Sequence, residues 1–274
     1  MPLTSSSIYH LPHLRHPKPL TIGMQPMTTP WLESPGDLAV IQQHKVRCRE
    51  QRAEDVYAVL PEGAAAANEL ALLVWQALGK DPAELQAAPS YERLWLASLE
   101  TFEDLVVMVP SANSHCLMAA SLCSPSHWRL RDKLGRPMAR IHDPIPRIHD
   151  QLTPRIERIM QNIRAEQPVE RFNWSLQADQ DWFCWPHEDG TAYPPETPLY
   201  YRVERQTLRR LPSSGALAFT IRVHLHPLET VSQQPGALSA LLAAVDETPA
   251  DMAAYKSFDR YQQALQKYRL LANH

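Results

Sequence analysis

The sequence LYYRVERQTL at residues 199–208, with LPSSG at 211–215 and ALAFTIRVHLH at 216–226, is the clearest structural pattern in the chain. Apolar and polar side chains alternate through both long runs, which is typical of β-strands with one buried face. The short connection is rich in residues that favour turns. Together these segments predict an antiparallel β-hairpin.

The predicted hairpin places one charge on an apolar face. Pairing the strands about a turn near Ser213 puts Arg205 among the alternate apolar side chains of residues 217–225. A buried arginine without a counter-charge would be costly in free energy. The pattern therefore predicts an anionic ligand for Arg205.

The same pairing sets the partners of the polar side chains on the other face. It places Glu204 opposite Arg222, where the two side chains could form a structural salt bridge. It also places Arg202 opposite His224. The role of Glu204 stays open between this bridge and a ligand-binding carboxylate.

Shorter signals predict the rest of the fold. Residues 1–30 contain six prolines and are expected to form an extended arm, whereas residues 31–274 are expected to form one domain. Residues 136–148 hold three prolines and are expected to be a loop or an extended segment. No regular alternation of strand and helix occurs, so the expected class is α+β with an antiparallel sheet. The expected helices lie at residues 64–78, 90–100, 128–133, 153–165, 250–256 and 257–271, and the further strands at 56–60, 104–110 and 115–123.

The composition excludes several classes of protein. A net charge of −3 and a pI near 6.5 argue against nucleic acid or an anionic membrane as a partner. No apolar run reaches the ~18 residues that span a bilayer, and residues 1–20 lack the apolar segment of a signal peptide. We therefore expect a cytoplasmic protein.

Redox and nucleotide motifs are also missing from the sequence. The 4 cysteines form no C-x-x-C pair, which excludes a zinc ribbon and the C-x-x-C-H signature of covalently attached haem. With only 8 glycines against 25 prolines, the chain has neither of the two common nucleotide-binding glycine loops.

Three groups of short motifs resemble one family, the alpha subunits of haem-dependent oxidative N-demethylases. The first is TIGMQP at 21–26 with WL at 31–32. The second is CSPSHW at 123–128, KLGRP at 133–137 and IHDPIP at 141–146. The third and most specific is RVERQTLRRLP at 202–212, followed by SG at 214–215 and FTI at 219–221. NWS at 173–175 and YK at 255–256 also fit, so the resemblance covers nearly the whole chain.

The resemblance implies a PAS-like fold, in which an antiparallel sheet is flanked by helices and holds non-covalent haem b. It implies oxidation of a small secondary amine such as dimethylamine by O2 and two electrons, to a primary amine and formaldehyde. The electrons would come from a separate reductase with FMN and an iron–sulfur cluster, so further subunits are expected as partners. The alternative is a haem-binding PAS-like sensor or assembly subunit without turnover.

Candidate cofactor ligands follow from this resemblance. His142 is the first choice for the axial iron ligand, because imidazole is a common haem ligand and the prolines beside it stiffen the loop. His224 and His226 are the alternatives. Haem propionates are carboxylates that match the fork of an arginine side chain, and the candidates for them are Arg140, Arg205 and Arg209.

Glu204 is the candidate catalytic residue. A secondary amine is a cation at neutral pH, so its pocket needs a carboxylate or an aromatic cage. A carboxylate beside haem would hold the ammonium group and accept its proton.

Overall fold

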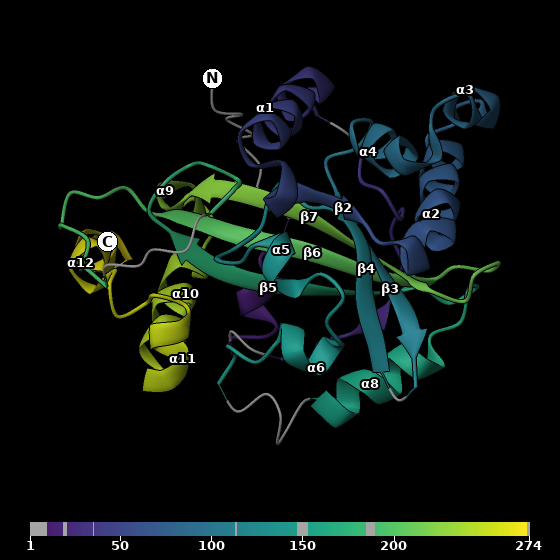
Figure 1. Cartoon of the computed structure of the whole chain (residues 1–274). Coiled ribbons are helices and arrows are strands. Elements are labelled where there is room, and N and C mark those ends of the chain that lie inside the picture. The colour runs from purple at the N-terminus through teal and green to yellow at the C-terminus, as the bar shows by residue number, and fades with distance from the viewer. Residues whose placement is uncertain are drawn as a thin grey trace.

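The computed structural model describes residues 10–18, 21–34, 36–112, 114–146, 153–184 and 190–272. Within them, a seven-stranded antiparallel sheet has the order β1-β5-β6-β7-β3-β4-β2 (Figure 1). The strands are β1 (Gln25–Pro26), β2 (Tyr57–Val59), β3 (Asp104–Ser111), β4 (Ser114–Ser121), β5 (Val169–Gln177), β6 (Tyr200–Arg210) and β7 (Leu217–Pro227). The predicted α+β class with an antiparallel sheet is confirmed.

The hairpin of β6 and β7 forms as predicted, but its register differs by one residue. Glu204 pairs with Val223, and Arg202 pairs with Leu225, so the predicted partners of both residues are wrong. A shift of one residue exchanges the faces on which side chains lie. Arg205 is therefore not on the apolar face of β7.

Helices cover both faces of the sheet. They are α1 (Leu38–Val56), α2 (Ala64–Ala77), α3 (Pro82–Gln86), α4 (Arg93–Ser98), α5 (Leu130–Lys133), α6 (Met138–Ile141), α8 (Thr153–Asn162), α9 (Leu228–Val231), α10 (Ala237–Asp246), α11 (Ala250–Tyr255) and α12 (Gln262–Ala272). Figure 1 shows α6 and α8 on one side of the sheet, with α2 and α4 on the other.

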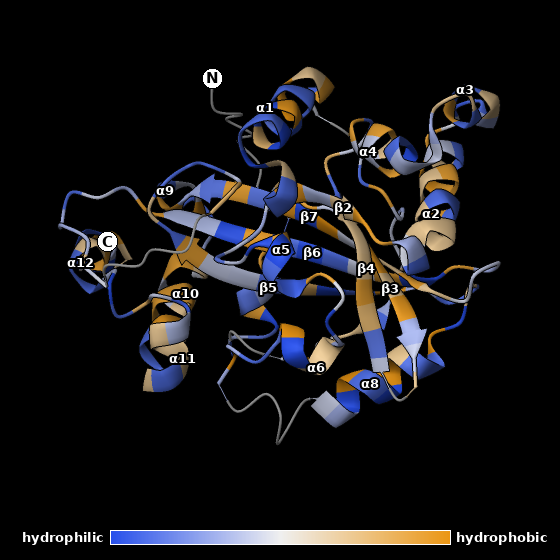
Figure 2. Ribbon diagram, in the orientation of Figure 1, coloured by the Kyte–Doolittle hydropathy of each residue, from blue (hydrophilic) through white to orange (hydrophobic). Residues whose placement is uncertain are grey.

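The two faces of the sheet bury different side chains. We call the face toward α6 and α8 the pocket face, and it carries Glu204 and Phe219. On the opposite face, α2 and α4 pack against residues of β3 and β4, while α10 and α12 pack against β5 and β6 around Trp174 and Tyr201. Figure 2 shows hydrophilic and hydrophobic residues mixed along the central strands. Several polar side chains of these strands are buried and need partners, among them Arg202, Glu204, Arg205 and Thr220.

Several elements differ from the sequence prediction. The strand β5 and the helices α1 and α10 were not expected, and residues 138–141 form the helix α6 where a loop or extended segment was expected. The buried side of α1 explains its weak signal, because it includes His44 and Lys45 besides apolar residues. The ammonium group of Lys45 donates hydrogen bonds to the backbone carbonyls of Ser98, Thr101 and Glu103.

The N-terminal arm contributes to the fold. Of residues 1–30, the structure describes 10–18 and 21–30. β1 pairs with β5, and His13 is buried with its Nδ1 atom 2.7 Å from the hydroxyl of Tyr201. Among the described helices, none has the length and apolar character needed to cross a membrane.

Candidate functional site

A large pocket lies between the pocket face of the sheet and the segments that cover it. The volume of the pocket is about 1800 Å³ when the open space at its entrance is included. The sheet wall comes from β3 to β7, and the other wall comes from α6, α8, the segment 124–128 and the end of α11. The apolar lining includes Met24, Val106, Met108, Leu117, Met138, Ile141, Ile156, Met160, Leu208, Phe219 and Ile221. Such an apolar cavity with a few polar groups is typical of cofactor and ligand sites.

His142 lines this pocket from the end of α6. Its Nδ1 atom lies 3.0 Å from the carbonyl oxygen of Met138. A carbonyl only accepts hydrogen bonds, so Nδ1 carries the proton of the neutral ring. The lone pair is then on Nε2, which is the usual arrangement of an imidazole that ligates a metal.

A second imidazole, that of His127, also lines the pocket. Its backbone has a positive φ of 59°, and its Nε2 atom lies 3.5 Å from the sulfur of Cys184. The contact with this thiol occupies one ring edge of His127. His142, whose hydrogen bond to a carbonyl fixes the tautomer, is the better candidate ligand.

Glu204 lines the sheet wall and is 8% exposed. It accepts hydrogen bonds from Nε of Arg202 at 3.0 Å and from the side-chain amide of Gln206 at 2.9 Å. Burial opposes ionisation, but the charge and hydrogen bond of Arg202 lower the pKa of Glu204 below its usual value. The pocket therefore contains an ionised carboxylate, and its salt-bridge partner is Arg202 instead of the predicted Arg222.

Lys256, at the end of α11, brings a cation to the same wall. Its Nζ atom donates to the side-chain oxygen of Asn173 at 3.1 Å and to the carbonyl of Trp174 at 2.6 Å. Burial lowers the pKa of Lys256 to about 7, although the negative charge of Glu204 opposes this shift. The side chain can therefore change between its charged and neutral forms near pH 7.

Arg171 on β5 is the least satisfied cation of the pocket. Its Nε atom is buried and has no hydrogen-bond partner among the described residues. Burial lowers the pKa of its guanidinium group, against the attraction of Glu204. A buried guanidinium with an unused donor is a site for an anionic group of a ligand.

The structure gives Arg205 a different role from the predicted one. It lies on the opposite face and is 1% exposed, and its guanidinium group contacts the carboxylate of Glu170 at 2.9 Å. It also donates to the carbonyls of Trp31 and Pro30. The predicted anion therefore exists, but it is Glu170 of the protein and not a cofactor carboxylate.

The other predicted arginines also lie outside the pocket. Arg209 is on the opposite face, with its guanidinium carbon 5.0 Å from the centre of the Trp31 ring. The side chain of Arg140 is 69% exposed and pairs with Asp143 at 3.5 Å. Neither lines the pocket, so both are replaced as candidates by pocket-lining cations.

The two alternative haem ligands lie on the opposite face as well. The rings of His224 and His226 are parallel, with centroids 6.4 Å apart, and neither residue lines the pocket. His142 is thus the only one of the three sequence candidates that the structure places there.

Two pocket cations, Arg171 and Lys256, were not recognised as site residues in the sequence. Arg171 belongs to the strand β5, whose alternation of Phe172, Trp174 and Leu176 would have revealed it. Lys256 follows a short helix, and no local pattern indicates that its side chain reaches β5.

The fold and the pocket define an α+β protein with a mostly apolar pocket that also contains several charged side chains. A model of the family described as haem-dependent oxidative N-demethylase, alpha subunit-like, matches residues 80–266. The chain belongs to this family, and the sequence resemblance is confirmed.

The pocket residues fit haem, the group that the family name implies. The apolar lining suits a macrocycle, His142 offers an imidazole nitrogen, and the unused donor of Arg171 suits a propionate. The two observations behind this fit are the imidazole of His142 in the pocket and the buried Nε donor of Arg171, which has no hydrogen-bond partner among the described residues.

Proposed function

We propose that this chain is the haem-binding subunit of an oxidative N-demethylase that acts on a small secondary amine such as dimethylamine. The observation that carries the proposal is one pocket with an imidazole on its helical wall and an ionised carboxylate on its sheet wall, His142 and Glu204. A PAS-like arrangement, with haem between the sheet and helices, is part of this proposal. Family membership supports it.

The residues that would hold haem are on both walls. His142 would ligate the iron through Nε2, because Nδ1 is engaged with Met138. Arg171 and Lys256 would pair with the propionates, which would satisfy the unused donor of Arg171 and favour the charged form of Lys256. Haem, when bound, supplies the iron centre that activates O2.

Glu204 would bind the substrate. A dimethylammonium ion that enters the pocket would bind the ionised carboxylate of Glu204, which also forms an ion pair with Arg202. Transfer of the ammonium proton to Glu204 exposes the nitrogen lone pair that oxidation requires. The apolar residues elsewhere in the pocket would contact the two methyl groups.

The proposed reaction needs electrons from another protein. Dimethylamine, O2, two electrons and two protons give methylamine, formaldehyde and water. The sequence has no motif for flavin nucleotides or a Cys-only iron–sulfur cluster, so a separate FMN and iron–sulfur reductase is the proposed donor, and other subunits of a complex are proposed partners.

Amine binding to the haem-loaded chain tests this role of Glu204. Dimethylamine should shift the Soret band of the wild-type protein, and Glu204→Gln should weaken that binding roughly 10- to 100-fold, the effect of losing a charged hydrogen bond. Glu62→Gln, a change of an exposed carboxylate outside the pocket, is the matched control and should bind as wild type does. Equal amine affinity in Glu204→Gln and wild type would leave Glu204 a structural partner of Arg202. No shift with any small secondary amine would favour a haem-binding sensor.

A further inference from the structure

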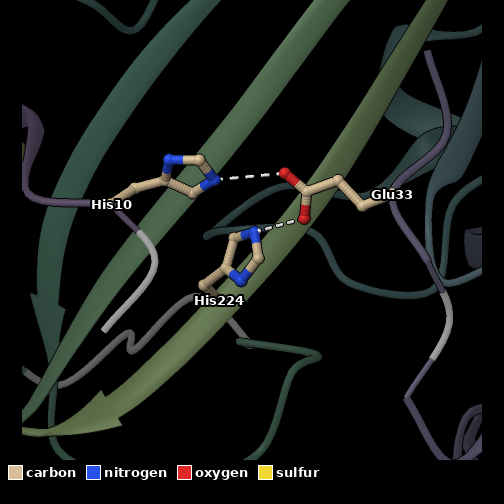
Figure 3. A group of neighbouring side chains, drawn as sticks. All are labelled: His10, Glu33 and His224. Atoms are coloured by element: carbon tan, nitrogen blue, oxygen red, sulfur yellow. Dashed lines mark hydrogen bonds and ion pairs between the residues drawn. The ribbon is translucent and has the colours of Figure 1, made fainter. Parts of the chain in front are cut away.

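Three potential metal ligands meet on the face of the sheet opposite the pocket. They are His10 of the N-terminal arm, Glu33 of the segment before α1, and His224 of β7 (Figure 3). The Nε2 atom of His10 lies 3.1 Å from one oxygen of Glu33, and Nε2 of His224 lies 2.9 Å from the other. One ligand atom from each residue lies within 4.8 Å of the other two. None of the three residues lines the haem pocket.

The donor set is one that metal centres use. Two imidazoles and one carboxylate bind zinc in some hydrolases and ferrous iron in non-haem oxygenases. Tetrahedral bonds of about 2 Å place neighbouring ligand atoms roughly 3.3 Å apart. The two nitrogen–oxygen separations are already close to this value. Because the two nitrogens face different oxygens of Glu33, an ion bound through one oxygen requires the carboxylate to turn.

Contacts between the carboxylate and the two imidazoles hold the cluster together in the structure. Burial opposes the ionisation of Glu33, but hydrogen bonds from His10 and His224 lower the pKa of its carboxyl. Burial lowers the pKa of His224, although Glu33 opposes this shift. Nε2 of each histidine faces an oxygen of Glu33, so a metal ion would replace the protons in these two contacts.

Two arginines limit the affinity of this cluster for a cation. Nε of Arg205 lies 3.7 Å from one oxygen of Glu33, and Nε of Arg222 lies 3.8 Å from the other. Both have other partners, since Arg205 pairs with Glu170 and the guanidinium carbon of Arg222 lies 3.9 Å from the centre of the Phe102 ring. The arginines weaken metal binding without occupying either imidazole.

We propose that His10, Glu33 and His224 bind one divalent transition-metal ion, zinc or ferrous iron, outside the haem pocket. The side chains are 25%, 22% and 8% exposed, so solvent reaches the cluster. Three protein ligands leave at least one coordination position for water or another small ligand. The ion ties the N-terminal arm and the segment before α1 to the central strand β7.

Metal content of the untagged, haem-loaded chain tests the proposal. The protein is equilibrated with Zn²⁺, or with Fe²⁺ without oxygen, and then freed of loose metal. Zinc per chain is measured directly, and non-haem iron is total iron minus haem. We expect close to one equivalent of at least one ion in wild type and a loss of most of it in His10→Ala, Glu33→Gln and His224→Ala.

His16→Ala is the matched control, because it removes an exposed imidazole of the same arm. This variant should keep the full equivalent of metal. Zinc or ferrous iron should also raise the unfolding temperature of wild type and His16→Ala but not of His10→Ala, whose far-UV circular dichroism and Soret band should stay unchanged. Equal metal content in wild type and His10→Ala, for both ions, overturns the proposal. The test is independent of haem binding, since a failure here leaves the Soret band of the wild-type protein intact.

Discussion

The buried ion pair between Glu170 and Arg205 provides a quantitative test of the corrected hairpin register. The side chains are 3% and 1% exposed, Nε of Arg205 donates to one carboxylate oxygen at 2.9 Å, and Nη2 lies 2.9 Å from the same oxygen in an ion pair. Glu170→Gln keeps the size of the side chain but removes its charge. Breaking a buried pair in this way costs about 3–5 kcal/mol, because the remaining charge is left uncompensated.

The expected cost lies at the lower end of that range. After the substitution, Arg205 keeps the carbonyls of Trp31 and Pro30 as acceptors, and the carboxylate of Glu33 remains 3.7 Å away. We therefore expect the free energy of unfolding to fall by about 3 kcal/mol, which corresponds to roughly two orders of magnitude in the folding equilibrium.

Urea unfolding of the haem-free chain, followed by far-UV circular dichroism, measures this change. Glu92→Gln is the matched control, because Glu92 and Arg49 form a short pair with side chains 26% and 28% exposed. That variant should lose no more than about 1 kcal/mol. A loss below 1 kcal/mol in Glu170→Gln would refute the reasoning. So would normal stability combined with loss of haem in an Arg205 variant, which would restore the propionate role.

Three further predictions follow from single contacts. Gly63→Ala should destabilise the chain by about 1–3 kcal/mol in the same unfolding assay, because the added Cβ atom would lie 2.7–2.9 Å from side-chain and backbone atoms of Met118, and an unchanged stability would contradict this packing. Arg171→Leu should weaken haem binding roughly tenfold or more without lowering the stability of the haem-free chain, because it removes a cation whose Nε donor is unused. A loss of stability with unchanged haem affinity would show that Arg171 stabilises the fold and does not bind haem. Lys256→Met should flatten the dependence of stability on pH between about 7 and 10.5. The pKa of Lys256 is lower in the folded state, so the unfolded chain binds more protons in this window and the stability of the wild type rises with pH. An identical slope in the variant would contradict the lowered pKa.

The alternating sequence was sufficient to predict the hairpin but not its register. The faces of β6 depend on whether Glu204 meets Arg222 or Val223, a difference of one residue in the connection. Local alternation is the same in both cases, so only tertiary packing decides between them. This is why Arg205 was predicted on the wrong face and Glu170 was not recognised as its partner.

The candidate site was predictable only in part. His142 stood out because prolines surround it and the family resemblance includes its motif, and it does line the pocket. Arg171 and Lys256 are 85 residues apart in sequence, from 171 to 256, and meet at the pocket only through the fold. His10, Glu33 and His224 come together in the same way. Such clusters have no local spacing by which a sequence could reveal them.

Haem binding through His142 is the central claim, and the absorption spectrum after reconstitution with haem tests it most directly. We predict one haem per chain and a Soret band for wild type and for His224→Ala, whose side chain lies outside the pocket. His142→Ala should lose ordered haem while its far-UV circular dichroism stays unchanged. A wild-type chain without a Soret band, or full haem occupancy with an unaltered spectrum in His142→Ala, would contradict the claim.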